Sequence, residues 1–404
     1  MRILMITNLF PPDVVGGYEI LCGQVAEALR ALGHDVRVLT TDGRTAGVAE
    51  PHISRALRLE QPFGEAFRPS RWRRRRLGLR NERVTAETIA DLDPDVIFLW
   101  SQRRLTLGPA RAAEASGVPV AWTLNDEYLA GFRAAARDGS WRRRIAAHVD
   151  ESWFRRDTTE VLRLTHVTAI SRCLRDRLVG QGVDVGGAEV IYQGPPLELF
   201  PRRRSPIDRV RRLLYVGQLH PDKGVHVAIE AVHRLAERLG SIDDAPSLTV
   251  VGAGGEAYTR RLRELADAGR ARVELVGAVP HREVPAFYRG HDALIFPSIW
   301  AEPFGLTHLE AMASGLPVIS TGHGGQGEVL EEGRTALLVE ANDVPGLAFA
   351  ICRLVESPAL AAGLARRGHQ LVRARLNLGT YVHRLERWLA QAAGLDCPAW
   401  RGAA

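Results

Sequence analysis

The feature that most constrains the fold of this chain is the alternation of short apolar runs with longer stretches of helical spacing. The runs predict strands and the stretches predict helices, a pattern typical of βαβ units with parallel sheets. The first such unit pairs a strand at residues 3–7 with a helix that carries Leu21, Val25 and Leu29 on one face. Further strands are expected at residues 36–40, 96–99, 118–124, 167–170, 189–192, 213–217, 248–251, 273–276, 293–296, 317–320 and 336–339.

The alternation is interrupted once, near the middle of the chain. Pro195 and Pro196 are followed by residues 201–206, in which three arginines stand between prolines, and this composition predicts a linker. We therefore predict two doubly wound α/β domains, residues 1–200 and 201–375, facing each other across a cleft. Residues 376–404 are expected to form a terminal helix that docks back towards the first domain through Tyr381, Leu385, Trp388 and Leu389.

Composition agrees with a globular protein of two domains. The chain has 404 residues, too many for one core, and its 46% hydrophobic and 25% charged residues exclude wholesale disorder or a disulfide-stapled mini-protein. The 4 cysteines are scattered, which favours a reducing cytoplasm, and the 13 histidines form no pair with metal-binding spacing, so no metal is expected. No apolar run approaches the roughly 20 residues of a membrane span, and the short run at 3–6 is not expected to act as a signal peptide.

The basic residues are unusual in type. Of the 53 lysines and arginines, Lys223 is the only lysine. An ammonium and a guanidinium are not interchangeable where a point charge meets phosphate at close range, so this exception indicates a phosphate-binding lysine. The alternative is that one lysine persisted by chance in a chain whose coding bias favours arginine.

Three loops that follow strands in the second half are candidates for ligand binding, because ligands of such sheets bind beyond the carboxyl ends of the strands. Residues 217–224 contain Gly217, Lys223 and Gly224 ahead of a helix, which suits a diphosphate. Residues 321–328 form a glycine-rich loop whose simpler interpretation is an ordinary strand-to-helix connection.

The remaining loop contains two carboxylates, Glu302 and Glu310, eight positions apart. We expect a helix to begin near Gly305, with the N–H groups of Gly305, Leu306 and Thr307 facing an anion. Glu310, inside the helix, would accept hydrogen bonds from a ribose diol, and Glu302 would face the group beyond the phosphates. The alternative is that both are carboxylates favoured by the helix dipole. His308 and His323 lie nearby, and a lone histidine is more often structural.

These motifs together resemble the retaining nucleotide-sugar glycosyltransferases of family 4, which have the GT-B fold of two Rossmann-like domains. The resemblance rests on residues 217–224, on Glu302 to Glu310 with the following residues 311–319, and on residues 324–328. In the first half it rests on Pro11-Pro12, Gly16-Gly17, residues 169–171 and residues 190–194 with Phe200. The order and spacing span nearly the whole chain.

The resemblance implies an acceptor-binding first domain, a nucleotide-sugar-binding second domain, and a role for each motif residue. Glu302 would hold the donor sugar near the reacting carbon, Glu310 the ribose and Lys223 the diphosphate, with no metal and no further cofactor. Catalysis is assigned to Glu302, Lys223 and Asp126. Donor binding is assigned to Gly16, Gly17, Gly217, Gln218, Lys223, Val279, Phe304, Gly305, Leu306, Thr307 and Glu310.

The sequence departs from the family pattern at two places. Gln218 stands where the family usually has an arginine beside the phosphate glycine, and an amide supplies no charge to a departing diphosphate. Asn125-Asp126 stands where the family often has a His-Asp step. These departures point to a different donor, a slower reaction or a compensating arginine from elsewhere.

The densest positive charge lies in the first half, between Arg68 and Arg83, and includes residues 71–76. It is interpreted as a docking surface for anionic lipid headgroups, as a surface for an anionic glycan, or as a solvated loop. Trp141, Ile145, Val149 and Trp153 recur at helical spacing, as in a membrane-facing helix or a helix packed on the sheet. No motif supports binding to nucleic acid.

The resulting hypothesis is a cytoplasmic enzyme, with peripheral membrane contact as one interpretation. It would transfer a sugar, with retention, from a UDP-, GDP- or ADP-sugar to a hydroxyl of a glycan, lipid-linked or small-molecule acceptor. The alternatives are a nucleotide-sugar-binding protein with little or no transferase activity, which Gln218 and Asn125 favour, and a nucleotide-sugar epimerase of the same fold.

Overall fold

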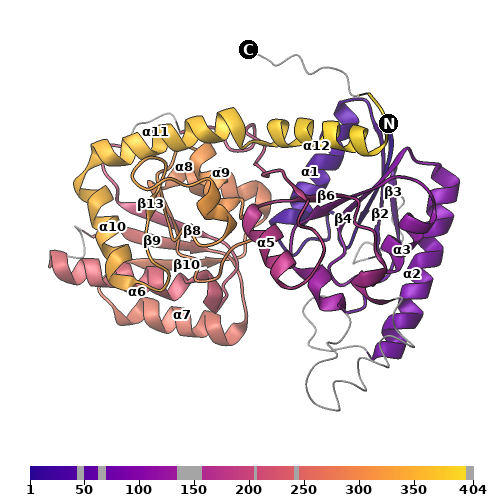
Figure 1. Ribbon diagram of the computed structural model, residues 1–404. Coiled ribbons are helices and arrows are strands. Elements are labelled where there is room, and N and C mark those ends of the chain that lie inside the picture. The colour runs from indigo at the N-terminus through magenta and orange to yellow at the C-terminus, as the bar shows by residue number, and fades with distance from the viewer. Residues whose placement is uncertain (43–49, 62–69, 134–156, 204–206, 241–244, 397–404) are drawn as a thin grey trace. The chain divides into compact units, whose positions relative to one another are not determined.

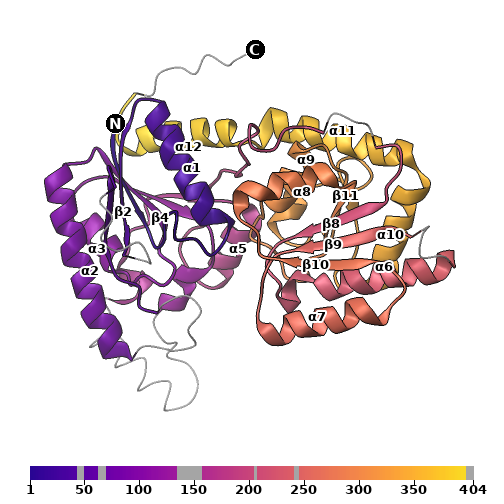
Figure 2. The same cartoon turned by 180° about the vertical axis from the view of Figure 1, so that it is seen from behind.

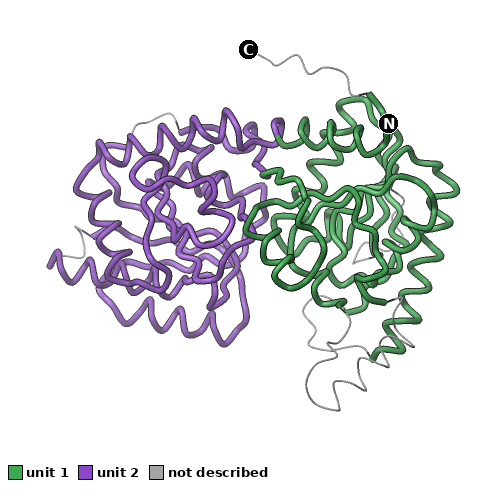
Figure 3. The backbone as a smooth tube through the Cα atoms, viewed as in Figure 1, with its two compact units in different colours: residues 1–192, 381–404 green, residues 193–380 purple. Residues whose placement is uncertain are grey.

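The computed structural model of the chain describes residues 1–42, 50–61, 70–133, 157–203, 207–240 and 245–396 (Figure 1). Its contacts divide into two compact units, which Figure 3 draws in different colours. Unit 1 comprises Met1–Tyr192 and Tyr381–Ala404, and unit 2 comprises Gln193–Thr380. The sequence placed the division after residue 200 and treated the terminal helix separately, whereas the contacts divide the chain after Tyr192 and assign the last helix to unit 1.

Unit 1 is built on a parallel sheet of seven strands in the order β3-β2-β1-β4-β5-β6-β7. The strands are β1 (Arg2–Thr7), β2 (Asp35–Thr41), β3 (Ile53–Leu57), β4 (Val96–Ser101), β5 (Val120–Leu124), β6 (His166–Ala169) and β7 (Glu189–Val190). The helices of the unit include α1 (Gly17–Ala31), α2 (Arg71–Leu92), α3 (Gly108–Ala115), α5 (Arg172–Gly180) and most of α12 (Leu378–Ala392). The strand order reverses between β1 and β4, which makes their carboxyl ends the expected ligand-binding edge.

Unit 2 repeats this architecture with six parallel strands in the order β10-β9-β8-β11-β12-β13. The strands are β8 (Arg212–Val216), β9 (Ser247–Val251), β10 (Val273–Gly277), β11 (Ala293–Phe296), β12 (Val318–Ser320) and β13 (Leu337–Leu338). The helices are α6 (Val225–Leu239), α7 (Glu256–Ala268), α8 (Val284–Gly290), α9 (Thr307–Ala313), α10 (Val344–Glu356) and α11 (Pro358–Arg375). Because β8 pairs with β11 at the reversal, the loops after these two strands are neighbours. The predicted class of two parallel α/β units is confirmed.

The last helix completes the hydrophobic core of unit 1. Trp388 meets Phe98 edge-on at 6.3 Å between ring centroids, and Tyr381 meets Trp100 in the same way at 6.5 Å. The His34 Nε2 and Glu386 Oε1 atoms lie 2.8 Å apart, which ties α12 to the end of α1 (Figure 1 and Figure 2). The apolar face that the sequence identified on this helix is therefore buried in unit 1.

The structure corrects three expectations. The arginine run at 71–76 forms the first turns of α2 rather than a loop, because Ser70 caps the helix and Gly78 and Thr85 are buried along it. The helix expected from Gly305 begins only at Thr307, since Gly305 has a φ of 83° that no right-handed helix accepts. Strand β3 was not predicted. Arg68, Trp141, Ile145, Val149 and Trp153 lie outside the described residues.

Gly224 lets the loop after β8 approach the loop after β11. It has a φ of 68°, and a Cβ added there would lie 2.0 Å from the carbonyl oxygen of Pro297. We expect Gly224→Ala to lower the free energy of unfolding by about 3 kcal/mol, through left-handed strain and a displaced carbonyl. Gly240→Ala is the control, because Gly240 has a φ of 71° with nothing within 4 Å. Equal losses in urea titrations of the two variants would contradict the explanation.

Candidate functional site

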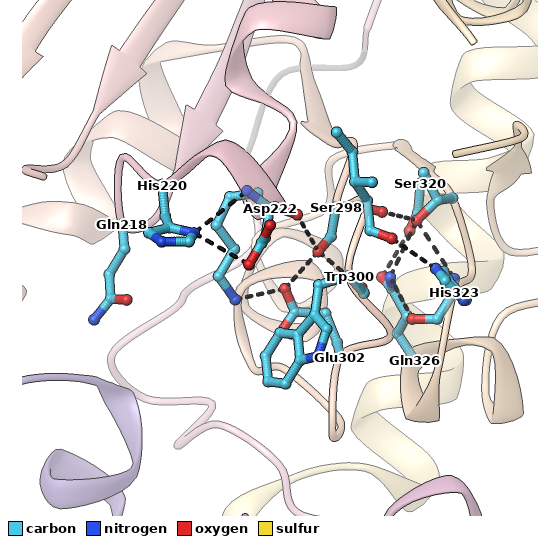
Figure 4. A network of polar contacts seen from close by, with 12 residues as sticks. Gln218, His220, Asp222, Ser298, Trp300, Glu302, Ser320, His323 and Gln326 are labelled. Carbon is cyan, nitrogen blue, oxygen red and sulfur yellow. Dashed lines mark hydrogen bonds and ion pairs between the residues drawn. The ribbon is translucent and has the colours of Figure 1, made fainter. Parts of the chain in front are cut away.

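Three loops of unit 2 converge on Glu302 at the carboxyl ends of β8, β11 and β12 (Figure 4). The carbonyl oxygen of Asp222, in the first loop, accepts hydrogen bonds from the N–H groups of Ile299 and Trp300 at 2.8 and 3.0 Å. The backbone of Glu302 pairs with the third loop, donating to His323 O at 3.1 Å and accepting from Gly325 N at 2.7 Å. The main chain thus fixes the position of this carboxylate from two sides.

Lys223 and Glu302 form an ion pair at the centre of these loops. The Lys223 Nζ atom lies 2.6 Å from Glu302 Oε1, and the same carboxylate oxygen accepts a hydrogen bond from Ser298 Oγ at 2.7 Å. The Glu302 side chain is 6% exposed and that of Lys223 is 21% exposed. The ammonium also lies 5.0 Å from the centroid of the Trp300 ring. A partly exposed cation held against a buried carboxylate is available to meet an incoming anion.

Glu310 lies on α9 beside a second set of polar groups. Tyr288 donates a hydrogen bond to Glu310 Oε2 at 2.8 Å, and His281 Nε2 lies 3.7 Å from Glu310 Oε1. Burial and the neighbouring Glu310 carboxylate raise the pKa of Tyr288 well above its ordinary value, so its hydroxyl remains a donor. The carboxylate is therefore held in one orientation by Tyr288.

We expect Glu310→Ala to weaken nucleoside diphosphate binding about 10- to 100-fold, because hydrogen bonds to a charged group contribute about 1.5–3 kcal/mol. Calorimetry with a nucleoside diphosphate and with the bare nucleoside measures the change, and both ligands should lose affinity. Tyr288→Phe keeps the carboxylate and serves as the matched variant, with a smaller loss. Unchanged nucleoside affinity in Glu310→Ala would contradict the assigned contact with ribose.

The other predicted donor-binding residues differ in what they present to solvent. Gln218 is exposed at the start of the β8 loop (Figure 4). Its carbonyl oxygen accepts a hydrogen bond from Tyr215 at 2.9 Å. Phe304 is fully buried, so its ring packs in the core and only its backbone can face a ligand. Val279 follows β10, half-buried, and Leu306 precedes α9 as its cap.

Sequence reasoning missed several residues of the site. Ser298, Trp300 and Tyr288 contact the two carboxylates or the lysine but belong to no motif that was singled out. The one available signal was the position of Ser298 and Trp300 in the same loop as Glu302. His308 is buried against Phe296 and Phe304, and burial lowers its pKa to about 3, so it is a neutral core residue.

In unit 1, polar side chains collect where β1, β4 and β5 end. Asn125 donates to the carbonyl oxygen of Trp100 at 2.8 Å, and Asp126 Oδ1 accepts from the N–H of Tyr128 at 2.9 Å. A small cavity of about 20 Å³ is lined by Gln102, Trp122 and Asp126, among others. Among the described residues, these three each carry a buried polar atom with no hydrogen-bond partner. Gly16, which caps α1, donates to Glu19 Oε2 at 2.7 Å, and Gly17 opens that helix.

Burial raises the pKa of Asp126 above its ordinary value of 3.8, although the N–H of Tyr128 and the charge of Arg103 act in the opposite direction. The folded state therefore holds this proton more tightly than the unfolded chain. The resulting stabilisation is complete below about pH 4 and is lost as the pH rises through the folded pKa. We expect Asp126→Asn to abolish this loss, so that its stability relative to wild type increases from pH 4 to pH 7 in urea titrations. Asp91→Asn, at an exposed position of α2, is the control, and parallel curves for all three proteins would contradict the prediction.

Among the described residues, no group of three or more histidine, cysteine or acidic side chains is placed to hold a metal ion. No single described helix has the length and apolar character to cross a membrane, although the bent pair Val344–Glu356 and Pro358–Ala392 passes the same test jointly.

Two doubly wound units, the second with a cation–carboxylate pair and a further carboxylate at the point where its strand order reverses, define the class of GT-B glycosyltransferases. Solved structures of this class share the fold. Sucrose-phosphate synthase from Thermosynechococcus elongatus superposes with a TM-score of 0.73 at 22% identity, covering 96% of this chain and 98% of that one. Anabaena HepE in complex with UDP and glucose superposes with a TM-score of 0.67 at 19% identity, covering 96% and 99%.

Sequence comparison gives the family. Residues 15–199 match the family described as Glycosyltransferase Family 4, and residues 200–371 match Glycosyl transferases group 1. Glycogen synthase of Mycobacterium tuberculosis is 31% identical over 402 residues, covering 92% of this chain and 90% of that protein. A phosphatidyl-myo-inositol mannosyltransferase of Mycolicibacterium smegmatis is 25% identical over 373 residues, covering 92% and 89%. The chain therefore belongs to the family 4 glycosyltransferases, and the predicted resemblance is confirmed.

Proposed function

We propose that this glycosyltransferase transfers a sugar with retention at the anomeric carbon, without a metal ion, to a hydroxyl of a glycan, lipid-linked or small-molecule acceptor. The observation that carries the proposal is the Lys223–Glu302 pair with its N–O distance of 2.6 Å. Lys223 would contact the diphosphate and offset the negative charge that develops as it leaves. Glu302 would hold the hydroxyls of the donor sugar.

The proposed reaction is a substitution on one face of the sugar. The bond between the anomeric carbon and the diphosphate oxygen breaks, and the acceptor oxygen bonds to the same face of that carbon. The acceptor proton passes to the leaving diphosphate, so no covalent sugar–enzyme intermediate is required. Glu302 already pairs with Lys223 and accepts from Ser298, which suits a carboxylate that binds rather than attacks.

The donor base is one of three candidates. Uracil is supported by the neighbouring Anabaena structures with UDP and UDP-glucose, and guanine by a relative named as a GDP-mannose-dependent mannosyltransferase of Mycobacterium tuberculosis, 27% identical. Adenine is the third candidate. The loop that holds Val279 after β10 would meet the base.

We place the acceptor in unit 1. Asp126, half-buried after β5, is the side chain there that would receive an acceptor hydroxyl. The exposed face of α2, with Arg76, Arg80 and Arg83, would contact anionic lipid headgroups and place a cytoplasmic enzyme beside a lipid-linked acceptor.

The deciding experiment is a calorimetric titration of UDP, GDP and ADP into the wild-type protein and into Lys223→Ala. One nucleotide should bind in the micromolar range and lose most of its affinity in the variant. Turnover of the matching donor sugar with an acceptor would then separate a transferase from a binding protein. Interconversion of donor epimers without an acceptor would identify an epimerase instead.

A further inference from the structure

An arginine-lined cavity lies at the edge of the unit 2 sheet opposite to the donor loops. It has a volume of about 450 Å³ and is lined at the amino ends of β8, β9, β10 and β11. Because the strands are parallel, these ends share one edge, while Lys223 and Glu302 follow the other ends of β8 and β11. Strand β8 has 5 residues and so separates the two edges by about 17 Å. A ligand in this cavity is therefore distinct from the donor diphosphate.

Arginines are the most frequent residues in the lining of the cavity. Of its ten lining residues, five are arginines and two are aspartates. The arginines are Arg203, Arg209, Arg211, Arg212 and Arg272. Like charges gathered around a recess repel one another, and a bound anion removes that repulsion.

Asp292 organises this cluster. Its Oδ2 atom accepts from the N–H groups of Arg211 and Arg212 at 3.1 and 2.9 Å. Its Oδ1 atom lies 3.5 Å from Arg203 Nη1 and 3.4 Å from Arg212 Nη2. The carboxylate, 7% exposed, is thus occupied by the start of β8 and by two guanidinium groups. The Arg211 side chain takes no part in these contacts.

Arg203 is the most enclosed cation of the cavity. Its side chain is 14% exposed, its Nη1 donates to the carbonyl oxygen of His291 at 3.1 Å, and its buried Nε has no hydrogen-bond partner among the described residues. A flat bilayer surface cannot reach such a group, whereas a small anion can enter a recess of this size. Guanidinium groups recognise phosphate through paired N–H donors, so the chemistry favours a phosphoryl group.

We propose that this cavity binds a small phosphorylated ligand, with its phosphoryl group on the arginines around Asp292. The uncharged part of such a ligand would lie against Ile207, Ala245 and Ser247, which complete the lining. The phosphoryl group belongs either to free inorganic phosphate or to a phosphate ester, and affinity distinguishes these two sources.

Calorimetric titration of inorganic phosphate and of glucose 6-phosphate into full-length Lys223→Ala tests the proposal, since this variant silences the phosphate contact of the donor site. Saturable binding of at least one probe is expected. Tighter binding of the ester identifies an ester ligand, and equal affinities identify free phosphate. Adding either Arg211→Gln or Arg212→Gln should weaken binding at least tenfold, whereas Arg263→Gln, an equal loss of charge on the exposed face of α7, should not.

Three results would overturn the proposal: no saturable binding in the millimolar range, equal weakening by Arg263→Gln, or binding to vesicles of anionic lipid that neither phosphate probe displaces. Arg203→Lys keeps the charge but not the guanidinium fork, and its affinity should also fall. The readout is independent of the proposed transferase function, because the donor nucleotide titrations depend on Lys223 and the cavity titrations do not.

Discussion

Glu302→Gln is expected to lower kcat by about 100- to 1000-fold while changing the Kd of the donor nucleotide less than about threefold. The amide keeps the shape of the carboxylate and can still accept from Ser298, which donates at 2.7 Å in the wild-type protein. It removes the charge that pairs with Lys223 and weakens the hold on the sugar hydroxyls. The nucleotide itself does not require that charge, so turnover should suffer far more than nucleotide binding.

Steady-state kinetics with the donor sugar and calorimetry with the nucleotide check this prediction together. Glu264→Gln is the control, because Glu264 is an exposed carboxylate on α7, away from the loops of the site. A Glu302→Gln enzyme with wild-type kcat would remove Glu302 from catalysis. Equal losses of nucleotide affinity and turnover in Glu302→Gln would indicate that Glu302 acts on the diphosphate rather than on the sugar.

Lys223→Ala is expected to weaken nucleoside diphosphate binding by about 100-fold or more and to leave the affinity for the bare nucleoside nearly unchanged. The Lys223 ammonium pairs with the buried Glu302 carboxylate and is the group that would contact the diphosphate. Its removal therefore abolishes the phosphate contact. Removal also leaves Glu302, 6% exposed, without its cation, and the free energy of unfolding should fall by about 3 kcal/mol. Urea titration and calorimetry separate these two effects.

Lys223→Arg tests whether position as well as charge matters. The ammonium lies 2.6 Å from Glu302 and 5.0 Å from the Trp300 ring, a space that a planar guanidinium does not fit without displacing one of them. We expect less than about one tenth of wild-type activity in this variant. Full activity would mean that the site does not require an ammonium, and that the single lysine persisted by chance in a chain whose coding bias favours arginine. Glu310→Ala should weaken the binding of the bare nucleoside and of the nucleoside diphosphate alike. Lys223→Ala, by contrast, should weaken the binding only of ligands that carry phosphate.

The sequence predicted most of the fold because both sheets are parallel and buried. Such strands are continuous apolar runs, and β11 falls where the run at 293–296 placed it. Strand β3 was missed because its run of five residues includes the polar Ser54 and Arg55. The arginine run of α2 was not recognised as helical because its buried contacts are made by Gly78, Asn81 and Thr85, which carry no apolar pattern.

The candidate site was predictable only where charge and spacing carry information. Lys223 and Glu302 lie far apart in the chain, yet the pairing of β8 with β11 places them in contact. Tyr288 could not be found in the same way, because its role depends on how α8 packs beside α9, and neither helix records that contact in its sequence. The Asp292 cluster was hidden for a related reason, since its arginines lie in the linker, at the start of β8 and just before β10, and the run at 201–206 indicated only a linker.

The packing of α12 has a consequence for how this protein is made. The rings of Tyr381 and Trp388 cover Trp100 and Phe98, yet they are synthesised almost 300 residues later. During translation the core of unit 1 cannot be completed until α12 has been synthesised. Phe98 and Trp100 therefore lack the rings that cover them while the whole of unit 2 emerges. A fragment that stops after the first unit would keep that surface exposed permanently, and it should aggregate unless the terminal helix is supplied as a separate peptide.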